Sequence, residues 1–190
     1  MRKKILMVVG GTGGHIYPGI ALAQNILSRD SEVEIDFAVD KRPLANKILG
    51  EKGFKFHKID SAPFPRKKFW QICRFIFNIN RGFIESVILL KKVDPAVIVA
   101  FGAYISVPVV LASSVLKIPV ILHEQNYYPG LANRFLTYRA EKVAISYKSS
   151  LKYFPPHKTV FTGNPVRKEI IEVTKKEGLE YLNLDENRVT

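Results

Sequence analysis

Ile5-Leu6-Met7-Val8-Val9-Gly10-Gly11-Thr12-Gly13-Gly14-His15 is the stretch of this sequence that decides its fold. Its five apolar residues are typical of a buried strand, and the four glycines leave little side-chain bulk in the following turn. We expect a helix to start near Pro18, because proline is tolerated in the first helical turn. The backbone N–H groups and the positive helix end would then suit a phosphate or diphosphate, whereas a tight turn without a ligand is the simpler alternative.

The composition is that of a globular protein with a strong positive charge. The 190 residues, 47% of them hydrophobic, can hold one α/β domain with a sizeable core and a little more. The single cysteine, Cys73, excludes a disulfide framework and suits a reducing compartment. We expect no signal peptide, and no uncharged apolar run approaches the roughly eighteen residues of a membrane span. The net charge of +12 predicts an anionic partner: nucleic acid, lipid headgroups or a phosphorylated substrate.

Strand-like apolar runs alternate with helix-like segments along the chain. This alternation predicts right-handed crossovers and a Rossmann-like parallel sheet with helices on both faces. We expect strands at residues 5–9, 33–39, 54–59, 96–100, 120–123, 142–145 and 159–161. We expect helices at residues 20–29, 43–51, 69–92 (with a break near 78–80 as an alternative), 107–116 and 131–138. Beyond Pro165 the composition changes to a charged helical segment, 167–182, and then to a polar turn that approaches another strand.

Three loops of this predicted sheet carry unusual residues. Ligands of open parallel sheets bind at the carboxyl ends of the strands, so the loops that follow strands are the candidate sites. The first loop is the glycine turn, which ends in His15. The second, residues 101–108, is rich in small residues and leads into a helix with Ser106 as its expected N-cap. The third is His123-Glu124-Gln125-Asn126. Two helix N-termini beside a histidine and a carboxylate predict a diphosphate site with acid–base groups.

The polar side chains of these loops also have structural interpretations. His15 can cap the helix or hydrogen-bond the turn, and Glu124 and Asn126 can satisfy backbone groups at the strand end. His123 ends a buried strand, so we expect it to be structural. Tyr104 fits the core and the loop surface equally well.

A basic, aromatic segment follows the third expected strand. At about 100° per residue its cations fall on one stripe with two aromatic residues beside them: Lys67, Arg74 and Arg81, with Trp70 and Phe77. We expect the opposite face to pack on the sheet through Phe69, Ile72, Cys73, Ile76 and Phe83. The stripe favours an interfacial helix on anionic lipid, while a solvated basic face and nucleic-acid binding are the alternatives.

The glycine turn does not match the dinucleotide fingerprint G-x-G-x-x-G. The sixth position counted from Gly11 is Ile16, and the third position counted from Gly10 is Thr12. Asp40 could still bind a ribose at the end of the second strand, so a nucleotide-binding oxidoreductase is kept as the weakest alternative. There is no Gly-Lys-Ser/Thr loop and no Cys/His cluster with metal-ligand spacing. We therefore expect no metal and no cofactor.

Four motifs in this order resemble the MurG family of bacterial cell-wall glycosyltransferases: residues 10–15 with Pro18-Gly19, 102–108, 123–126 and 163–167. The likeness runs from about Lys4 to Arg167. It implies the GT-B fold, two Rossmann-like domains facing a cleft, with this chain as the N-terminal half. Residues 1–163 would form the acceptor- and membrane-binding domain. Residues 164–190 would form the interdomain linker and the start of a donor-binding domain that would continue beyond Thr190.

The resemblance implies an inverting hexosyltransferase. Such an enzyme moves N-acetylglucosamine from UDP-GlcNAc to lipid I, the undecaprenyl-diphosphate-linked muramyl pentapeptide, and forms lipid II in peptidoglycan synthesis. A natural split subunit that binds the acceptor and recruits a separate donor subunit is the alternative, and in either case we expect no transferase activity from this chain alone. The implied partners are lipid I, UDP-GlcNAc and an anionic membrane surface, without nucleic acid. The implied location is peripheral, on the cytoplasmic face of the bacterial inner membrane.

The resemblance also implies roles for single residues. The catalytic candidates are His15 as first choice of base or orienter, Glu124 as second choice, and Asn126. The donor-facing candidates are Thr12, Asn126 and Arg167. The acceptor diphosphate would be bound by Gly11, Thr12, Gly13, Gly14, Gly102, Ala103, Tyr104 and Ser106. The membrane-binding candidates are Lys67, Trp70, Arg74, Phe77 and Arg81.

Two residues depart from the family's second loop, where Ala103 and Val107 replace glycines. We expect the alanine to be a mild change if its φ is negative. The β-branched valine should stiffen the loop, so the diphosphate would be held in a slightly different pose.

Overall fold

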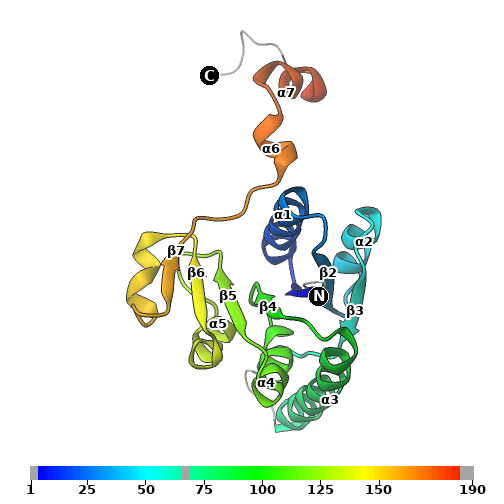
Figure 1. The fold of residues 1–190 in the computed structure, drawn as a ribbon, viewed down its shortest axis with the longest axis vertical. Helices are drawn as coiled ribbons and strands as arrows, with labels where there is room; N and C mark the ends of the chain where they lie inside the picture. The colour runs from blue at the N-terminus through cyan, green and yellow to red at the C-terminus, as the bar shows by residue number, and fades with distance from the viewer. Residues whose placement is uncertain (1–3, 66–68, 185–190) are drawn as a thin grey trace.

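A computed structural model of the chain describes residues 4–65 and 69–184. Within this part the chain forms one parallel sheet of seven strands in the order β3-β2-β1-β4-β5-β6-β7 (Figure 1). The strands are β1 (Lys4–Val8), β2 (Glu34–Asp40), β3 (Phe56–Ile59), β4 (Val97–Ala100), β5 (Val120–Glu124), β6 (Lys142–Ile145) and β7 (Thr159–Phe161). The helices are α1 (Gly13–Arg29), α2 (Pro43–Glu51), α3 (Phe69–Val93), α4 (Ser106–Leu116), α5 (Leu131–Leu136), η1 (Thr137–Arg139), η2 (Lys148–Tyr153), α6 (Lys168–Glu172) and α7 (Lys175–Leu182).

The predicted parallel α/β architecture is confirmed, and the strand ends shift by only one or two residues. The expected start of the first helix is wrong. Helix α1 begins at Gly13, inside the glycine motif, because the Thr12 carbonyl already accepts hydrogen bonds from His15 N and Ile16 N. Pro18 lies inside the helix, where it removes a single backbone hydrogen bond near the helix end. Helix α3 is continuous through residues 78–80, and η2 is an element that the sequence pattern does not indicate.

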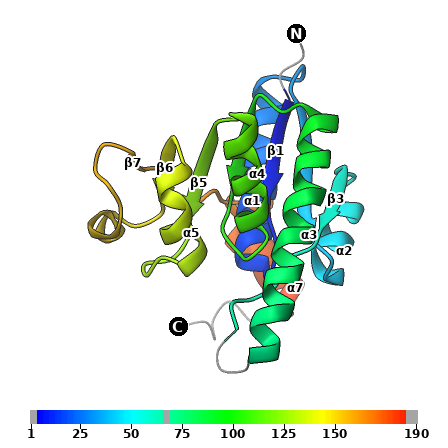
Figure 2. The same ribbon diagram turned by 90° about the horizontal axis from the view of Figure 1, so that it is seen from below.

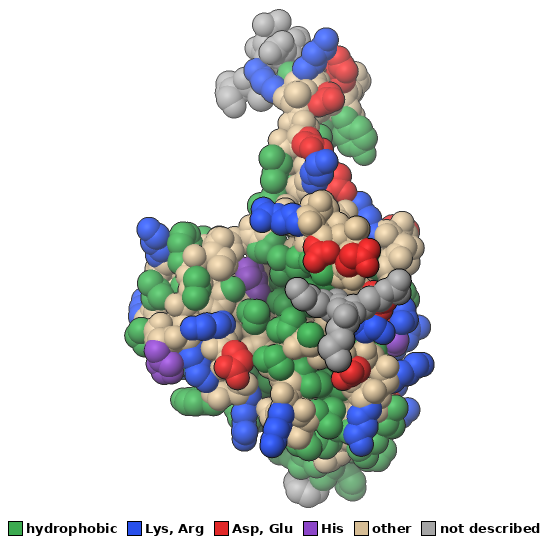
Figure 3. Space-filling view, viewed as in Figure 1, with side chains coloured by type: hydrophobic (Ala, Val, Ile, Leu, Met, Phe, Trp, Pro, Cys, Tyr) green, Lys and Arg blue, Asp and Glu red, His purple; other side chains and the backbone are tan. Residues whose placement is uncertain are grey.

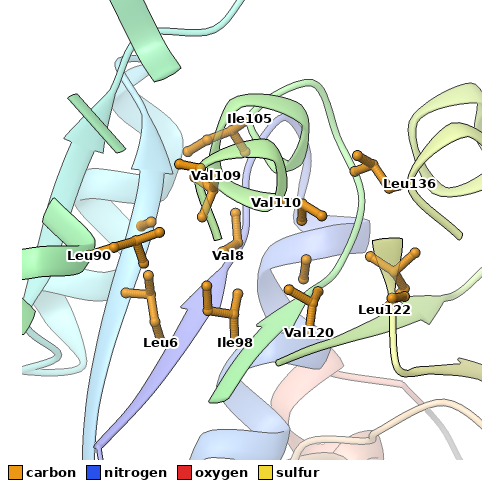
Figure 4. Packing of buried hydrophobic residues seen from close by; sticks show 14 of the residues in the cluster. Leu6, Val8, Leu90, Ile98, Ile105, Val109, Val110, Val120, Leu122 and Leu136 are labelled. Atoms are coloured by element: carbon orange, nitrogen blue, oxygen red, sulfur yellow. The ribbon is translucent and has the colours of Figure 1, made fainter. Parts of the chain in front are cut away.

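Two hydrophobic cores cover the two faces of the sheet. Alternate side chains of a strand point to opposite faces, so Leu6 and Val8 pack in one core while Met7 and Val9 pack in the other. The first core includes side chains from α3, α4 and the end of α5, which lie together on one face in Figure 2. Figure 4 shows Leu6, Val8 and Ile98 of the strands directed toward Leu90, Val109 and Val110 of the helices. The second core is closed by α1 and α2.

Only the C-terminal half of α3 packs on the sheet. Its 25 residues span about 37 Å, which exceeds the length of the strands it covers, and its first turns extend beyond them (Figure 2). The expectation that Ile72, Cys73 and Ile76 pack on the sheet is therefore wrong, since all three are exposed. Phe83 does pack against the core, as expected. Lys67 and the side chain of Phe69 lie outside the part that the structure describes.

The exposed half of α3 displays large apolar side chains. Trp70 is 82% exposed and Phe77 66%. In Figure 3 hydrophobic side chains gather at the lower end of the molecule, over this half of the helix, with Lys or Arg side chains nearby. None of the helices in the described residues is long and apolar enough to span a bilayer.

Helix α3 is fixed to the body at Gly82, where it passes very close to the chain that follows β3. A methyl group on Gly82 would lie 2.0 Å from the Asp60 carbonyl oxygen, a distance that only a backbone shift can relieve. Ion pairs reinforce this junction, because Arg81 Nε lies 2.8 Å from Asp60 Oδ2 and 3.2 Å from Glu85 Oε1. Lys41 Nζ adds a contact of 2.6 Å to Asp60 Oδ1.

We predict that Gly82→Ala lowers the free energy of unfolding by about 3 kcal/mol, because the methyl group overpacks a backbone contact. The matched control is Gly50→Ala in α2, where a methyl group meets no atom within 4 Å. That substitution should stabilise the protein by about 0.5–1 kcal/mol through helix propensity. Denaturant unfolding followed by circular dichroism measures both changes. Equal stability of the two variants would contradict the tight junction between α3 and Asp60.

Candidate functional site

The two glycine-containing loops meet where the strand order reverses. Strands β1 and β4 are neighbours in the sheet, although the chain visits β2 and β3 between them. Ligands of open parallel sheets bind at such a switch point, beyond the carboxyl ends of the strands. The loops after β1 and β4 touch there, because a methyl group on Gly11 would lie 3.6 Å from Ala103 Cβ. The sequence-predicted convergence of these two loops is therefore present.

The buried carboxylate of Asp40 fixes the first loop through hydrogen bonds. Gly11 takes a positive φ of 83°, and its N–H donates to Asp40 Oδ2 at 2.8 Å. The same carboxylate accepts from Arg42 Nη2 at 2.6 Å and Nε at 3.1 Å. Asp40 is 4% exposed, so these charge-assisted hydrogen bonds keep its carboxylate in place. The sequence suggests Asp40 only as a ribose ligand. Its partner Gly11 lies 29 residues away in the chain, so no local motif marks this role.

The hydrogen bonds of the first loop decide which amides can meet an anion. Gly11 N is used by Asp40, Thr12 N donates to the Gly10 carbonyl, and His15 N donates to the Thr12 carbonyl. Within the described residues, the N–H groups of Gly13 and Gly14 have no such partner, as expected for the first turn of a helix. No acidic residue stands in this turn to offset the helix dipole. The predicted anion cradle would therefore use the N–H groups of Gly13 and Gly14 and not those of the full glycine motif.

The second loop differs from expectation at two residues. Ala103 has a positive φ of 62°, directly after Gly102 with a φ of 85°, so its replacement of glycine is not mild. A left-handed alanine costs about 1 kcal/mol. Ser106 is the first residue of α4 and not its N-cap, which is Ile105. The Ser106 hydroxyl is buried and donates to the Gly102 carbonyl, so it shapes the loop from within.

Glu124 organises the third loop. The carboxylate is 1% exposed and accepts from Asn126 N at 2.9 Å, Asn126 Nδ2 at 3.0 Å, Gly130 N at 3.0 Å and Asn133 Nδ2 at 3.0 Å. Four donors to one buried carboxylate are a strong constraint on loop geometry. They leave Glu124 badly placed as a base but well placed to orient Asn126.

Asn133 connects the third loop to the second. Its side-chain Nδ2 also donates to the His123 carbonyl at 3.1 Å, and a methyl group on Gly102 would lie 3.2 Å from the same atom. The residue lies on α5 and is 2% exposed. Sequence reasoning missed it, because no motif marks an asparagine seven residues after the His-Glu-Gln-Asn corner.

His15 lies between charged groups of opposite sign. Its Nδ1 is 3.3 Å from Thr12 Oγ1, and Thr12 itself is exposed. Burial lowers the pKa of His15, the negative charge of Glu124 opposes this shift, and the positive charge of Arg42 adds to it. A histidine with a lowered pKa is neutral at pH 7 and can accept a proton.

His123 is structural, as its position predicts. It is 4% exposed, its Nε2 lies 3.2 Å from the Gly163 carbonyl oxygen, and its ring contacts Phe101. The contact with Gly163 joins the end of β5 to the segment that follows β7. Burial lowers the pKa of His123, as it does that of His15.

Arg167 closes one side of the first loop. Its guanidinium lies 4.2 Å from the centroid of the Tyr17 ring, a cation–π distance. An open hollow of about 390 Å³ lies between the start of α1 and this segment, lined by Gly13, Gly14, Tyr17, Pro18, Asn164, Pro165, Val166, Arg167 and Ile170. The two open glycine amides and the arginine therefore border the same space.

A second hollow, of about 690 Å³, connects the second loop to α3. Tyr104 and Arg74 line it together with Phe64, Phe75, Asn78 and the chain after β3. Of the other sequence-predicted membrane residues, Trp70, Phe77 and Arg81 lie on the same helix, and Lys67 lies outside the described residues. Arg81 is engaged with Asp60 and Glu85. Arg74 forms no ion pair with any carboxylate in the described part of the chain.

The chain matches known glycosyltransferases along most of its length. Residues 5–145 match the Glycosyltransferase family 28 N-terminal domain. The UDP-N-acetylglucosamine--N-acetylmuramyl-(pentapeptide) pyrophosphoryl-undecaprenol N-acetylglucosamine transferase of Halothermothrix orenii is 40% identical over 184 residues, covering 95% of this chain and 49% of the relative. The enzyme of the same name from Clostridioides difficile is 37% identical, covering 98% of this chain and 46% of the relative. The chain thus spans about half the length of the curated relatives it matches.

Solved structures support the same fold. The MurG crystal structure from Acinetobacter baumannii superposes with a TM-score of 0.71 at 23% identity, covering 87% of this chain and 47% of that one. A UDP-GlcNAc 2-epimerase from Neisseria meningitidis bound to UDP-GlcNAc gives a TM-score of 0.65 at 16% identity, covering 94% and 53%. The GT-B expectation for the fold is confirmed. The oxidoreductase alternative is wrong, because the chain matches a glycosyltransferase family and the Asp40 carboxylate already binds Gly11 N and the Arg42 guanidinium.

We predict that the His15 imidazole titrates below about pH 6.5, the ordinary value for histidine, in a pH series of ring NMR spectra. Arg42→Gln should raise this pKa, because it removes a nearby positive charge. The control is Lys47→Gln, which removes an exposed cation from α2, the helix whose N-cap is Arg42, and should leave the pKa unchanged. Because the folded state favours neutral His15, its contribution to stability is complete above pH 6.5 and is lost as the pH falls below it. A pKa of His15 above the ordinary value would contradict this site geometry.

Proposed function

Because this chain belongs to glycosyltransferase family 28, whose N-terminal domain it contains, we propose that it is the acceptor-binding half of an N-acetylglucosaminyltransferase. The proposed acceptor is a polyprenyl-diphosphate-linked N-acetylmuramyl pentapeptide, lipid I, and the proposed donor is UDP-GlcNAc. The names of the matched enzymes contain both substrates. We assign residues 1–163 to the acceptor domain and the segment from 164 to the linker toward a donor-binding domain.

The observation that carries this proposal is the pair of open amides at the start of α1. Gly13 N and Gly14 N point out of a helix whose positive end is not offset by an acidic residue. Arg42 lies beside Gly11, and Arg167 lines the same hollow as Gly13 and Gly14. A diphosphate fits such a cradle, because it can accept from both amides and pair with a cation. We assign Gly102, Ala103 and Tyr104 of the second loop to the same diphosphate site, because Ala103 lies beside Gly11, whereas Ser106 supports the loop from inside.

We propose that His15 removes the proton from the acceptor sugar hydroxyl. The hydroxyl oxygen then attacks the anomeric carbon of the donor sugar, the bond to UDP breaks, and the configuration inverts. Asn126, held by Glu124 through its backbone and side-chain nitrogens, orients the reacting sugar. Glu124 is a positioning residue in this scheme. Thr12 and Arg167 face the donor side of the cleft, and the leaving diphosphate is stabilised by helix dipoles and arginine.

The exposed half of α3 is the proposed membrane contact. Trp70 and Phe77 offer apolar side chains that can enter the headgroup region, and Arg74 offers an uncompensated cation beside them. Arg81 contributes less, since Asp60 and Glu85 already neutralise it. The hollow lined by Arg74 and Tyr104 links this surface to the second loop. On this basis the protein acts at the cytoplasmic face of the membrane.

We predict that Gly14→Asp weakens binding of a lipid I analogue with a short prenyl chain at least about tenfold, because a carboxylate in the cradle repels the diphosphate. Calorimetric titration measures the affinity. The fold should tolerate the change, since a methyl group here makes only an ordinary contact of 3.6 Å and an acidic residue favours a helix N-terminus. Gly178→Asp in α7, where a methyl group meets no atom within 4 Å, is the matched control. Unchanged affinity of the first variant would refute the diphosphate site.

We predict that Arg74→Glu reduces binding to phosphatidylglycerol-containing vesicles at least about tenfold. The substitution changes the charge that faces the anionic surface by about two units, from positive to negative. Trp70→Ser should weaken it through lost apolar insertion. Lys91→Glu, the same charge change at the far end of α3, is the control and should bind like the unaltered chain. Cosedimentation at rising salt measures these effects. Binding of all variants in equal amounts would disprove the membrane face.

A further inference from the structure

A group of tyrosines and lysines lies beside the third loop and takes no part in the functions proposed so far. We call it the Tyr–Lys cluster and define it as Tyr127, Tyr128, Tyr147, Lys148, Lys152 and Tyr153. Its residues come from the loop after β5 and from the segment after β6, so they share the carboxyl edge of the sheet with the glycine loops. In Figure 3 hydrophobic side chains and Lys or Arg side chains lie together over the β6–β7 edge.

The aromatic rings of the cluster contact one another while remaining open to solvent. The Tyr127 and Tyr128 centroids are 4.7 Å apart, Tyr127 and Tyr147 are 6.4 Å apart, and Tyr128 and Tyr153 are 6.0 Å apart. Tyr128 is 71% exposed and Tyr147 is 51% exposed. Grouped, exposed tyrosines are characteristic of binding surfaces, because each ring adds apolar contact area and a polar tip at low entropic cost.

The lysines of the cluster have no carboxylate partner. Lys152 Nζ lies 5.7 Å from the Tyr127 centroid and 5.2 Å from the Tyr153 centroid, and Lys148 Nζ lies 5.4 Å from the Phe161 centroid. Neither lysine forms an ion pair with any Asp or Glu among residues 4–65 and 69–184. The surface therefore combines aromatic faces with two positive charges that an anionic ligand group can approach.

The cluster is rigidly joined to the proposed catalytic loop. Ser150 is fully buried, and its hydroxyl lies 3.3 Å from the Asn126 carbonyl oxygen and 2.9 Å from that of Tyr127. On the other side, Glu124 accepts from Asn126 N and Gly130 N, on either side of the two exposed tyrosines. A loop held at both ends loses less backbone freedom when a ligand binds to its rings.

We propose that the Tyr–Lys cluster binds the peptide of the N-acetylmuramyl acceptor, with the lysines pairing with its C-terminal carboxylate and the tyrosine rings covering its backbone. This inference rests on the proposed function. The peptide of an N-acetylmuramyl group is carried on the sugar itself, so it must leave the site close to the reacting hydroxyl. Asn126 is the residue proposed to orient that sugar, and the cluster begins at the next position. Charge complementarity and continuity with the site therefore both favour this occupant.

The test compares two probes by calorimetric titration of the 190-residue chain. One is N-acetylmuramyl pentapeptide diphosphate with a short prenyl chain, and the other is the same molecule without its peptide. We expect the peptide-bearing probe to bind about tenfold more tightly, which corresponds to two exposed ion pairs of intermediate strength. The double variant Lys148→Glu/Lys152→Glu should lose this preference but keep its affinity for the peptide-free probe within about twofold.

Control variants separate this inference from the proposed function. Lys91→Glu/Lys92→Glu changes the net charge equally at the C-terminal end of α3 and should keep the preference, whereas Gly14→Asp should weaken both probes. Equal affinity of the unaltered chain for both probes, or a preference that survives the double variant, would overturn the peptide site and leave the diphosphate site intact. Binding of neither probe would overturn both. Self-association that Tyr128→Ser abolishes in sedimentation would assign the surface to a second copy and also overturn the inference.

Discussion

The site depends on one buried carboxylate, that of Glu124. A carboxylate that is 1% exposed is stable only if hydrogen-bond donors replace its lost water, and here four donors from three residues do so. Satisfying that one group sets the path of the chain from Asn126 to Gly130 and fixes the position of α5 through Asn133. The same hydrogen bonds fix the backbone and side chain of Asn126 and hold both ends of the segment that carries the exposed rings of Tyr127 and Tyr128. A substitution that removed the carboxylate would therefore disturb geometry before it disturbed chemistry.

Asp40 plays the matching part under the first loop, and the two carboxylates together explain the electrostatics of the site. Each is buried and accepts hydrogen bonds from N–H donors, and Asp40 also pairs with the Arg42 guanidinium. Arg42 neutralises Asp40 and remains half exposed beside the glycine loop. The charges of Arg42 and Glu124 both affect the pKa of His15, and burial, the largest effect, lowers it. The result is a cradle with open amides, nearby cations and a neutral histidine.

The features that follow from local pattern could be predicted, and those that depend on distant partners could not. Buried strands show as apolar runs, and parallel strands place their following loops at one edge, so the convergence of residues 10–15, 101–106 and 123–126 follows from the sequence. The start of α1 at Gly13 could not be predicted, because glycine has a low helix propensity and the first hydrogen bonds of the helix go to the backbone carbonyl of Thr12, which no side-chain pattern marks. Periodicity gives α3 two faces but does not reveal that the sheet ends beneath it. Asn133 is invisible for a similar reason, since its partners lie nine and ten residues away on another element.

The strand order arranges the proposed contacts in the same sequence as the chemical parts of the acceptor. The apolar and basic surface of α3 borders the loop after β3, the amide cradle follows β1 and β4, Asn126 follows β5, and the Tyr–Lys cluster continues after β6. Neighbouring strands are about 4.8 Å apart, so β3 to β6 covers about 24 Å of edge. A lipid–diphosphate–sugar–peptide molecule presents those four chemistries in that order, and an extended pentapeptide alone reaches about 17 Å. An acceptor laid along this edge would meet an apolar surface, open amides, an oriented amide side chain and free cations in turn. A compact nucleotide would not reach the α3 surface and the Tyr–Lys cluster at the two ends of this edge.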